Sequence, residues 1–369
     1  MTTDADNERA EKSATALRRG WTTGACATAA TRAAFTALIT GEFPDPVHIV
    51  LPKGHTPSFA LALEELTLDG ARAGIIKDAG DDPDVTHGAM VVVTVSRADA
   101  GTGVVFEAGE GVGVVTKPGL PIAAGEAAIN PVPRQLMTQT ITELAHEHGH
   151  SSDVNIQISI PGGAALAEQT WNPRLGIVGG LSILGTTGVV IPYSCSAWIH
   201  SIHRGIDVAI ATGTSHVAGC TGSTSEKTVQ ALYGLSIGAM LDMGDFAGGM
   251  LKYLRKHPVA RLTIGGGFGK LSKLAMGHLD LHSGRSQVNV DFLAEQLQLV
   301  GAPQSLVAQA KQAISANAVL EIAAAYRTQL ANQVAKAACE VACARLRNDM
   351  SVDVVVIDRA GNIVGRSDG

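Results

Sequence analysis

The sequence predicts two domains, an α+β domain followed by an α/β domain with a parallel sheet of about four strands. Three observations predict this arrangement. At 369 residues the chain is long for a single hydrophobic core. Its first half carries runs of strands with few helices, whereas strand, glycine turn and helix alternate in its second half. Glycine is abundant, at 42 residues, and is clustered at turns. We place the boundary at residues 192–194.

The first domain, residues 17–192, is expected to combine two helices with several strands. Thr22–Thr40 is rich in alanine, and Val132–His148 carries a proline in its first turn, where proline is tolerated. Short apolar runs bounded by proline and glycine are typical of strands. The expected strands are Val47–Leu51, Ser58–Leu68, Ala89–Val95 and Val154–Ile160. Gly101–Pro121 is expected to be a long loop. Residues 1–16 are polar and charged, which predicts a flexible tail and no secretory signal.

The second domain, residues 193–369, predicts a parallel sheet with crossover helices, because each strand is followed by a turn and a helix. The expected strands are His216–Cys220, Ala239–Met243, Arg261–Ile264 and Val352–Asp358. The expected helices are Ser194–Thr212, one after Thr221–Glu226, one from Gly244 to His257, one opening at Gly265–Lys270, and a long one over Val319–Asn348.

Composition excludes several classes of protein. The net charge of −6 argues against nucleic acid as a partner, since phosphate binding needs a basic face. No apolar run approaches the roughly 20 residues of a membrane span. Five cysteines do not form a disulfide framework, and the pair Cys339 and Cys343 alone does not make a zinc site. The acidic stretch Asp78–His87 lacks the spacing of a calcium loop. We therefore expect a cytoplasmic protein without a metal site of its own.

Three glycine turns in the second domain form the candidate cofactor site. Each follows a strand and precedes a helix, which brings free backbone N–H groups to the carboxyl edge of the sheet. Ligands bind at that edge in open α/β sheets. None of the turns matches a phosphate loop or a dinucleotide fingerprint, so each alone is equally consistent with a tight connection. Asp245 is also a candidate helix N-cap. The candidate cofactor-binding residues are Thr221, Gly222, Asp242, Gly244, Asp245, Gly265, Gly266 and Gly267.

The first domain contributes cations and hydroxyl groups. Arg18, Arg19, Thr22 and Thr23 lie just before an expected helix, where they could bind an anion or serve as a charged, Thr-capped helix start. Arginines beside proline, as in 130–134 and 172–176, suit carboxylate recognition, although capping or a surface ion pair is an alternative.

Several long motifs, in order along the chain, resemble the CbiD family, the cobalt-precorrin-5B C-1 methyltransferases of anaerobic cobalamin (vitamin B12) synthesis. They are Arg18–Ala27, Gly80–Gly88, Gly111–Pro121, Ile129–Arg134, Asn172–Ile177, Gly180–Gly188, Gly244–Phe246 and Lys270–Leu274. The turn Cys220–Glu226 departs from the family, where basic residues commonly follow Thr-Thr-Gly. An anion at this turn would therefore be bound by backbone rather than by side chains.

The resemblance implies a fold and a reaction. The first domain would be similar to the second domain of ribosomal protein S5, and the second would hold a small parallel sheet. S-adenosylmethionine would donate a methyl group to C-1 of cobalt-precorrin-5B to give cobalt-precorrin-6A, with the cobalt carried by the substrate. Such a transfer depends mainly on positioning, and we assign no catalytic residue.

A non-catalytic carrier of corrinoid intermediates is the alternative function. A homo-oligomer is compatible with the sequence. Candidate partners for the substrate's carboxylates are Arg18, Arg19, Thr22, Thr23, Lys117, Arg134, Arg174, Lys270 and Lys273.

Overall fold

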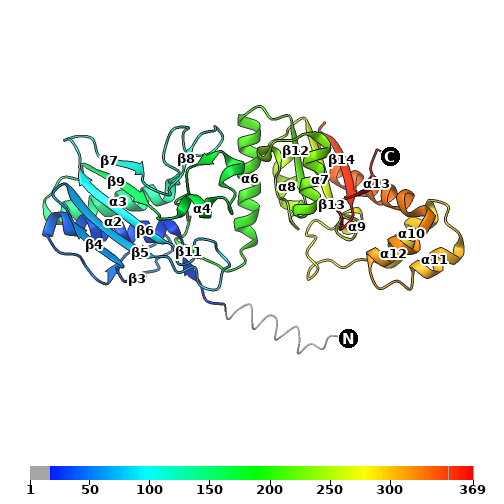
Figure 1. Ribbon diagram of the computed structural model, residues 1–369, viewed down its shortest axis with the longest axis horizontal. Helices are drawn as coiled ribbons and strands as arrows, with labels where there is room; N and C mark the ends of the chain where they lie inside the picture. The colour runs from blue at the N-terminus through cyan, green and yellow to red at the C-terminus, as the bar shows by residue number, and fades with distance from the viewer. Residues whose placement is uncertain (1–16, 348, 369) are drawn as a thin grey trace. The chain divides into compact units, whose positions relative to one another are not determined.

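The computed structural model describes residues 17–347 and 349–368, so the tail expected at residues 1–16 lies outside the described residues. The chain divides into two compact units, Met1–Ser194 and Cys195–Gly369. Each unit holds its own principal sheet (Figure 1). No helix in the described part of the chain is both long enough and apolar enough to cross a membrane.

The first unit is built on a five-stranded mixed sheet with the order β4-β5-β6-β9-β7. All neighbours pair antiparallel except β7 and β9, which are parallel. The strands are β4 (Leu63–Leu66), β5 (Gly70–Ile76), β6 (Met90–Arg97), β7 (Val104–Ala108) and β9 (Val154–Ser159). Three two-stranded ladders join β1 (Gly20–Trp21) to β11 (Val189–Val190), β2 (Val47–His48) to β3 (Ser58–Phe59), and β8 (Val114–Val115) to β10 (Ile177–Val178).

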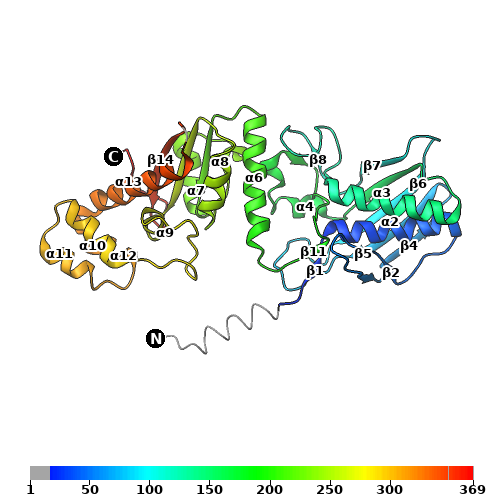
Figure 2. The ribbon, with the colours of Figure 1, turned by 180° about the vertical axis from the view of Figure 1, so that it is seen from behind.

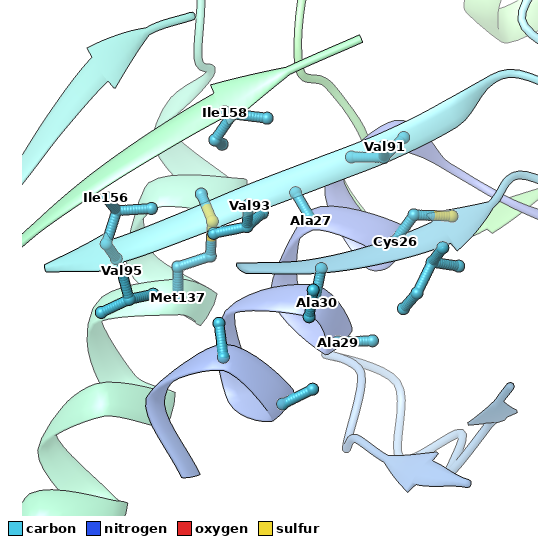
Figure 3. Packing of buried hydrophobic residues seen from close by; sticks show 14 of the residues in the cluster. Cys26, Ala27, Ala29, Ala30, Val91, Val93, Val95, Met137, Ile156 and Ile158 are labelled. Carbon is cyan, nitrogen blue, oxygen red and sulfur yellow. The ribbon is translucent and has the colours of Figure 1, made fainter. Parts of the chain in front are cut away.

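Two helices, α2 (Thr23–Thr40) and α3 (Pro131–His148), lie side by side over one face of this sheet (Figure 2). Alanines on α2 let it approach the strands closely, and Ala27 with Met137 of α3 points toward Val93 of β6 (Figure 3). Two short helices, α4 (Gly163–Ala167) and α5 (Asn172–Leu175), precede β10.

The second unit is built on a four-stranded sheet in which three strands run parallel and the last is antiparallel. The order is β12 (His216–Cys220), β13 (Arg261–Gly267), β14 (Ser351–Ile357) and β15 (Ile363–Arg366).

Helices cover both faces of this sheet. On one face, α7 (Ser223–Tyr233) packs Val229 against Ala218 and Val355. Helices α8 (Ala247–Leu254), α9 (Phe268–Ala275) and α13 (Arg327–Leu346) belong to the opposite side, where Gly219 meets Met250 of α8. The remaining elements are α6 (Cys195–Ala211), α10 (Val290–Leu299), α11 (Gln304–Ala310), α12 (Ala316–Ile322) and the 3₁₀ turns η1 (Ile237–Ala239) and η2 (Ala324–Tyr326).

The mixed α/β character is confirmed, but the fourth strand is not the expected one. Ala239–Met243 was predicted to be a strand, and this is wrong: only Met240 makes an isolated parallel bridge, to Ala218. Asp242 has a φ of 37°, which bends the backbone out of an extended ladder. β15 takes the fourth place instead, because the chain turns back directly after β14.

Other predicted elements also differ from the structure. Ser58–Leu68, expected to be one strand, forms β3 and β4, which belong to different sheets. Gly101–Pro121 is not a continuous loop, since it contains β7 and β8. The helix expected over Val319–Asn348 is broken at Ala324, whose φ is 46°, into α12, η2 and α13. Strand β5 was missed because it consists largely of glycine and alanine, which are weak strand formers. Its glycines fit the packing, since a Cβ on Gly74 would lie 2.8 Å from Cβ of Leu63 on the neighbouring strand.

Candidate functional site

A cavity of about 880 Å³ opens at the carboxyl edge of the second unit's sheet. The parallel strands β12, β13 and β14 all end there, as the alternation of strands and turns predicted. Its volume falls within the roughly 300–1,000 Å³ that is typical of small-molecule sites. The lining consists of 221–225, 267–270, Val288, 315–317, Leu320, Glu321, Arg327 and 357–360.

Two helices direct uncapped N-termini at this cavity. The N-cap residues of α7 and α9 are Gly222 and Gly267, and neither helix has a side-chain cap among the described residues. The first N–H groups of a helix have no intrahelical acceptor, and they carry a partial positive charge. By contrast, Ser315 caps the N-terminus of α12 by accepting a hydrogen bond of 3.2 Å from the Ala318 N–H. The donors of α7 and α9 therefore remain available to a ligand.

Nothing in the fold requires glycine at these two N-caps. Gly222 has φ 168° and ψ 170°, an extended conformation open to any residue, and a Cβ there would meet no heavy atom within 4 Å. Gly267 has φ −68°, and its Cβ would come no closer than 4.0 Å to the carbonyl oxygen of Ile357. A larger residue would fit both positions but would intrude on the cavity.

Two neighbouring predicted glycines have a different role. A Cβ on Gly265 would lie 2.6 Å from Val229, and one on Gly266 would lie 2.8 Å from the Thr221 side chain. Both residues are buried and neither lines the cavity. They let α7 and the Thr221 turn pack tightly against β13, so close packing is by itself a reason for glycine at both positions.

Lys270 reaches the cavity but is held by the protein. Its Nζ lies 3.0 Å from Oδ1 of Asp245 and donates a hydrogen bond of 3.1 Å to the carbonyl of Thr221. The predicted N-cap role of Asp245 is therefore not seen, because Phe246 is the N-cap of α8 and Asp245 pairs with Lys270 instead. Lys270 thus braces the first glycine turn against the second.

Three further predicted residues, Asp242 and Gly244 near the second glycine turn and Lys273 of α9, lie outside the cavity lining. The carbonyl of Asp242 accepts a hydrogen bond of 2.9 Å from the indole of Trp198, and Gly244 packs against the same ring. Lys273 is buried and donates to the carbonyl of Leu281 at 3.0 Å, and burial lowers its pKa. These contacts commit the three residues to holding the loops around β12 and α9.

An acidic turn closes the cavity beyond β14. Asp358 accepts hydrogen bonds from the N–H groups of Ala360 and Asn362, both at 2.9 Å. Burial raises the pKa of this carboxyl, but the hydrogen bonds and the nearby Arg327 outweigh it and leave the pKa below its ordinary value. Arg327 lies 3.9 Å away, a long ion pair. Asp358 is therefore a carboxylate at neutral pH.

Sequence reasoning identified three cofactor candidates that line the cavity, namely Thr221, Gly222 and Gly267. It missed 223–225, Glu321, Arg327 and the segment 357–360. The signal for 357–360 was present, since Val352–Asp358 was predicted as a strand and the same carboxyl-edge rule applies to the turn that follows it. Glu321 and Arg327 reach the site only because the long helix is broken, which the sequence did not indicate.

In the first unit, most predicted substrate-binding side chains serve the fold. Arg18 is paired with Asp78, and the hydrogen bond from Arg18 lowers the pKa of that carboxyl to about 2. Thr22 caps α2 by accepting from the Ala25 N–H at 3.2 Å. The Thr23 hydroxyl accepts from the N–H of Leu184 at 3.0 Å. Three of the four side chains predicted to form an anion seat before α2 are thus bound to the chain's own groups.

The other four substrate-binding candidates of the first unit are cations. Arg134 donates to the carbonyl of Ile129 at 2.8 Å and lies 2.9 Å from Glu126. Arg174 stacks over Trp171, with its guanidinium carbon 5.6 Å from the ring centroid. For Arg19 and Lys117, the described part of the chain provides no ion-pair partner. Within the predicted set of first-unit cations, Arg19 and Lys117 are therefore the two that remain available to a ligand.

The acidic loop from Asp78 to His87 uses its carboxylates internally. Asp81 accepts from the N–H of Arg18 at 2.6 Å, Asp82 accepts from that of Tyr193 at 2.8 Å, and Asp84 pairs with Lys77 at 2.6 Å. Within residues 17–347 and 349–368, no three histidine, cysteine or acidic side chains are arranged to hold a metal ion.

The fold and the cavity define a class: an α/β protein with a ligand-sized opening at the carboxyl edge of a mostly parallel sheet, formed without a phosphate-loop or dinucleotide motif. The chain belongs to the CbiD family, whose model matches residues 10–192, while the model of the CbiD C-terminal domain matches residues 280–368. The motif resemblance is thereby confirmed.

Relatives match almost the whole chain. The cobalt-precorrin-5B C(1)-methyltransferase of Brucella anthropi is 61% identical over 365 residues, which covers 99% of this chain and 98% of that protein. The protein of the same name from Paramagnetospirillum magneticum is 60% identical over 351 residues, or 95% and 98% of the two chains. A crystal structure of the cobalamin biosynthesis protein CbiD from Archaeoglobus fulgidus is 27% identical, covers 73% of this chain and 83% of that one, and gives a TM-score of 0.40.

Proposed function

We propose that this chain transfers a methyl group from S-adenosylmethionine to C-1 of cobalt-precorrin-5B in cobalamin biosynthesis. The observation that carries this proposal is the identity of about 60% to the cobalt-precorrin-5B C(1)-methyltransferases along 95–99% of the chain. In the reaction a carbon–carbon bond forms between the methyl group and C-1, the carbon–sulfur bond breaks, and its electron pair remains on sulfur, which gives S-adenosylhomocysteine.

The methyl donor is proposed to bind in the cavity at the sheet edge of the second unit. The cavity is large enough for a nucleoside with an amino-acid side arm. Its lining includes the uncapped first turns of α7 and α9 together with the apolar residues Phe268, Val288 and Leu320. A donor held there would be positioned for transfer without covalent participation by the protein, which suits an activated sulfonium.

The carboxylates of the macrocycle are proposed to bind Arg19 and Lys117 of the first unit. The support is that Arg19 and Lys117 lack ion-pair partners in the described residues, whereas Arg18 and Arg134 are already paired. The first unit is also proposed to share the fold of the second domain of ribosomal protein S5. The placement of α2 and α3 on one face of a mixed sheet supports this likeness.

The direct test is methyl transfer under anaerobic conditions. Incubation with cobalt-precorrin-5B and S-adenosylmethionine labelled in its methyl group should place the label at C-1 of the product, as followed by mass spectrometry and ¹³C NMR. Product without label, or no product from authentic substrate, would contradict the proposed reaction.

The alternative, a non-catalytic carrier of corrinoid intermediates, needs no donor site. Isothermal calorimetry with S-adenosylhomocysteine separates the two functions, because a carrier should bind the corrinoid but not this nucleoside. Binding of S-adenosylhomocysteine by the protein without substrate favours the methyltransferase.

A further inference from the structure

Arg359 lines the cavity, and hydrogen bonds fix the backbone of the turn that contains it. It lies in the turn between β14 and β15, where the Asp358 N–H donates to the carbonyl of Asn362 at 2.9 Å and the Asp358 side chain binds two N–H groups of the turn. A further hydrogen bond of 3.0 Å runs from the Thr228 hydroxyl of α7 to the carbonyl of Gly361. The turn is thereby fixed to the helix whose uncapped N-terminus faces the same cavity.

Arg359 is also the cation without an internal partner among the cavity-lining residues that the structure describes. Lys270 pairs with Asp245, and Arg327 lies near Asp358. The exposed guanidinium of Arg359 has neither a hydrogen bond nor an ion pair within residues 17–347 and 349–368. A cation that lines a cavity, is fixed at its backbone and is free at its head group is arranged to bind an anion from outside the chain.

We propose that Arg359 binds the carboxylate of the methyl donor and thereby sets the donor's orientation in the cavity. This inference rests on the proposed function. The donor carries one carboxylate, at the end of its amino-acid arm, and a guanidinium binds a carboxylate through two parallel hydrogen bonds. The amino-acid end then lies beside α7 and the β14–β15 turn. The adenine then lies toward the part of the lining that contains the apolar residues Phe268, Val288 and Leu320.

The test compares two ligands that differ in the amino-acid arm. S-adenosylhomocysteine carries the carboxylate, and 5′-methylthioadenosine lacks the whole arm. Calorimetry should show that Arg359→Ala weakens binding of S-adenosylhomocysteine by roughly tenfold or more, the effect of losing one charge-assisted contact, and leaves binding of methylthioadenosine unchanged. Arg359→Lys should restore part of the loss, because lysine keeps the charge but not the fork.

Arg345→Ala is the matched control. Arg345 is exposed in the last turn of α13 and outside the cavity, so its removal changes the net charge equally but should leave both affinities unchanged. Thermal unfolding of each variant verifies that the fold is intact. Wild-type binding of S-adenosylhomocysteine should also weaken with salt more steeply than that of Arg359→Ala.

Other outcomes would overturn the inference in distinguishable ways. If Arg359→Ala binds S-adenosylhomocysteine as tightly as the wild type while methyl transfer continues, the orientation is wrong and the methyltransferase function stands. If the variant changes only KM for cobalt-precorrin-5B, Arg359 binds a carboxylate of the macrocycle instead. If the wild type binds no S-adenosylhomocysteine and transfers no label, the proposed function itself fails, and the orientation fails with it.

Discussion

Lys77 shows at the scale of a single residue how the first unit accommodates a buried charge. Its side chain is 1% exposed, and its Nζ lies 2.6 Å from Asp84, which also accepts hydrogen bonds from the backbone and hydroxyl of Thr86. Sequence reasoning treated this region as an acidic loop and did not identify Lys77. The ion pair is local in sequence, but the burial that makes it important depends on the packing of the whole unit.

Removing one member of this pair should be costly. Lys77→Met leaves a mostly buried Asp84 without its cation, and we expect the free energy of unfolding to fall by about 3–5 kcal/mol in urea denaturation. The double variant Lys77→Met/Asp84→Asn should recover part of that loss, because it removes both charges. Strict additivity of the two single substitutions would show that the pair is not coupled.

Asp78 predicts a pH dependence of stability. Its folded pKa of about 2 lies below the ordinary value of 3.8, chiefly because of the hydrogen bond from Arg18. The unfolded chain therefore takes up the proton first as the pH falls. The stabilisation is fully present above about pH 4 and is lost between pH 4 and pH 2. Solvent screening moderates it, because both side chains are about half exposed.

The measurement is the difference in melting temperature between the wild type and Asp78→Asn. We expect the wild type to be the more stable at pH 7 and the difference to shrink as the pH approaches 2. A difference that stays constant over this range would show that the carboxylate contributes nothing through its charge.

The substrate-binding candidates show that the sequence does not reveal which cations are paired with distant parts of the chain. Arg18 was a reasonable partner for a substrate carboxylate, yet its partner Asp78 lies 60 positions along the chain. Residue type and spacing identify a cation, but only the fold decides whether another part of the chain neutralises it. For the same reason Arg18 is paired within the chain, whereas its neighbour Arg19 has no such partner among the described residues.

At the scale of secondary-structure elements, the alternation of strand, turn and helix located the cavity correctly. This pattern could not distinguish glycines needed for close packing from glycines beside open space, because both kinds occur where a strand leads into a helix. The close contact of Gly265 with Val229 joins residues on different elements, and the open space at Gly222 is equally a product of the assembled unit. Substitution of these two glycines is therefore expected to change the stability of the fold in opposite directions.

Gly222→Asp should stabilise the protein and weaken donor binding. An aspartate at the N-cap of α7 can accept from the free first-turn N–H groups, a gain of a few tenths of a kcal/mol over glycine. The same carboxylate would occupy the donors offered to the ligand and repel an anion. We expect at least a tenfold loss of affinity for S-adenosylhomocysteine in calorimetry.

Gly222→Ala is the control, because it adds the same Cβ without an acceptor. Its effect on affinity should be clearly smaller than that of Gly222→Asp. Equal affinity of the wild type and Gly222→Asp would show that the N-terminus of α7 does not contact the ligand.

Gly265→Ala should instead destabilise the fold. The added Cβ would lie 2.6 Å from Val229 and 3.0 Å from the Cys220 sulfur in a buried position, which forces the helix or the strand to shift. Overpacking of this kind typically costs about 1–3 kcal/mol. Thermal or urea denaturation should detect the loss, and a variant as stable as the wild type would show that α7 adjusts without strain.

At the scale of the whole molecule, the sequence predicted the division between two sheets but not all of their strands. Strand β5 escaped because its alanines and glycines are selected for contact with neighbouring strands and with α2, not for intrinsic β preference. Strand β15 escaped because a four-residue edge strand carries little pattern of its own. The cavity is completed in part by the turn before β15 and by the break before α13, so these local misses account for 357–360, Glu321 and Arg327 among the site residues that were not predicted.

Ligand binding should therefore protect one unit and not the other. Saturation with S-adenosylhomocysteine at about 100 times Kd should add roughly 2.7 kcal/mol to the stability of the state that binds it. Hydrogen–deuterium exchange should slow in 221–226, 267–270 and 357–361, because these segments line the cavity or brace its turn. Helices α2 and α3 in the first unit should exchange at unchanged rates and serve as the internal control. Protection confined to the first unit would move the donor site away from the sheet edge, since binding at that edge cannot leave the first turns of α7 and α9 unprotected.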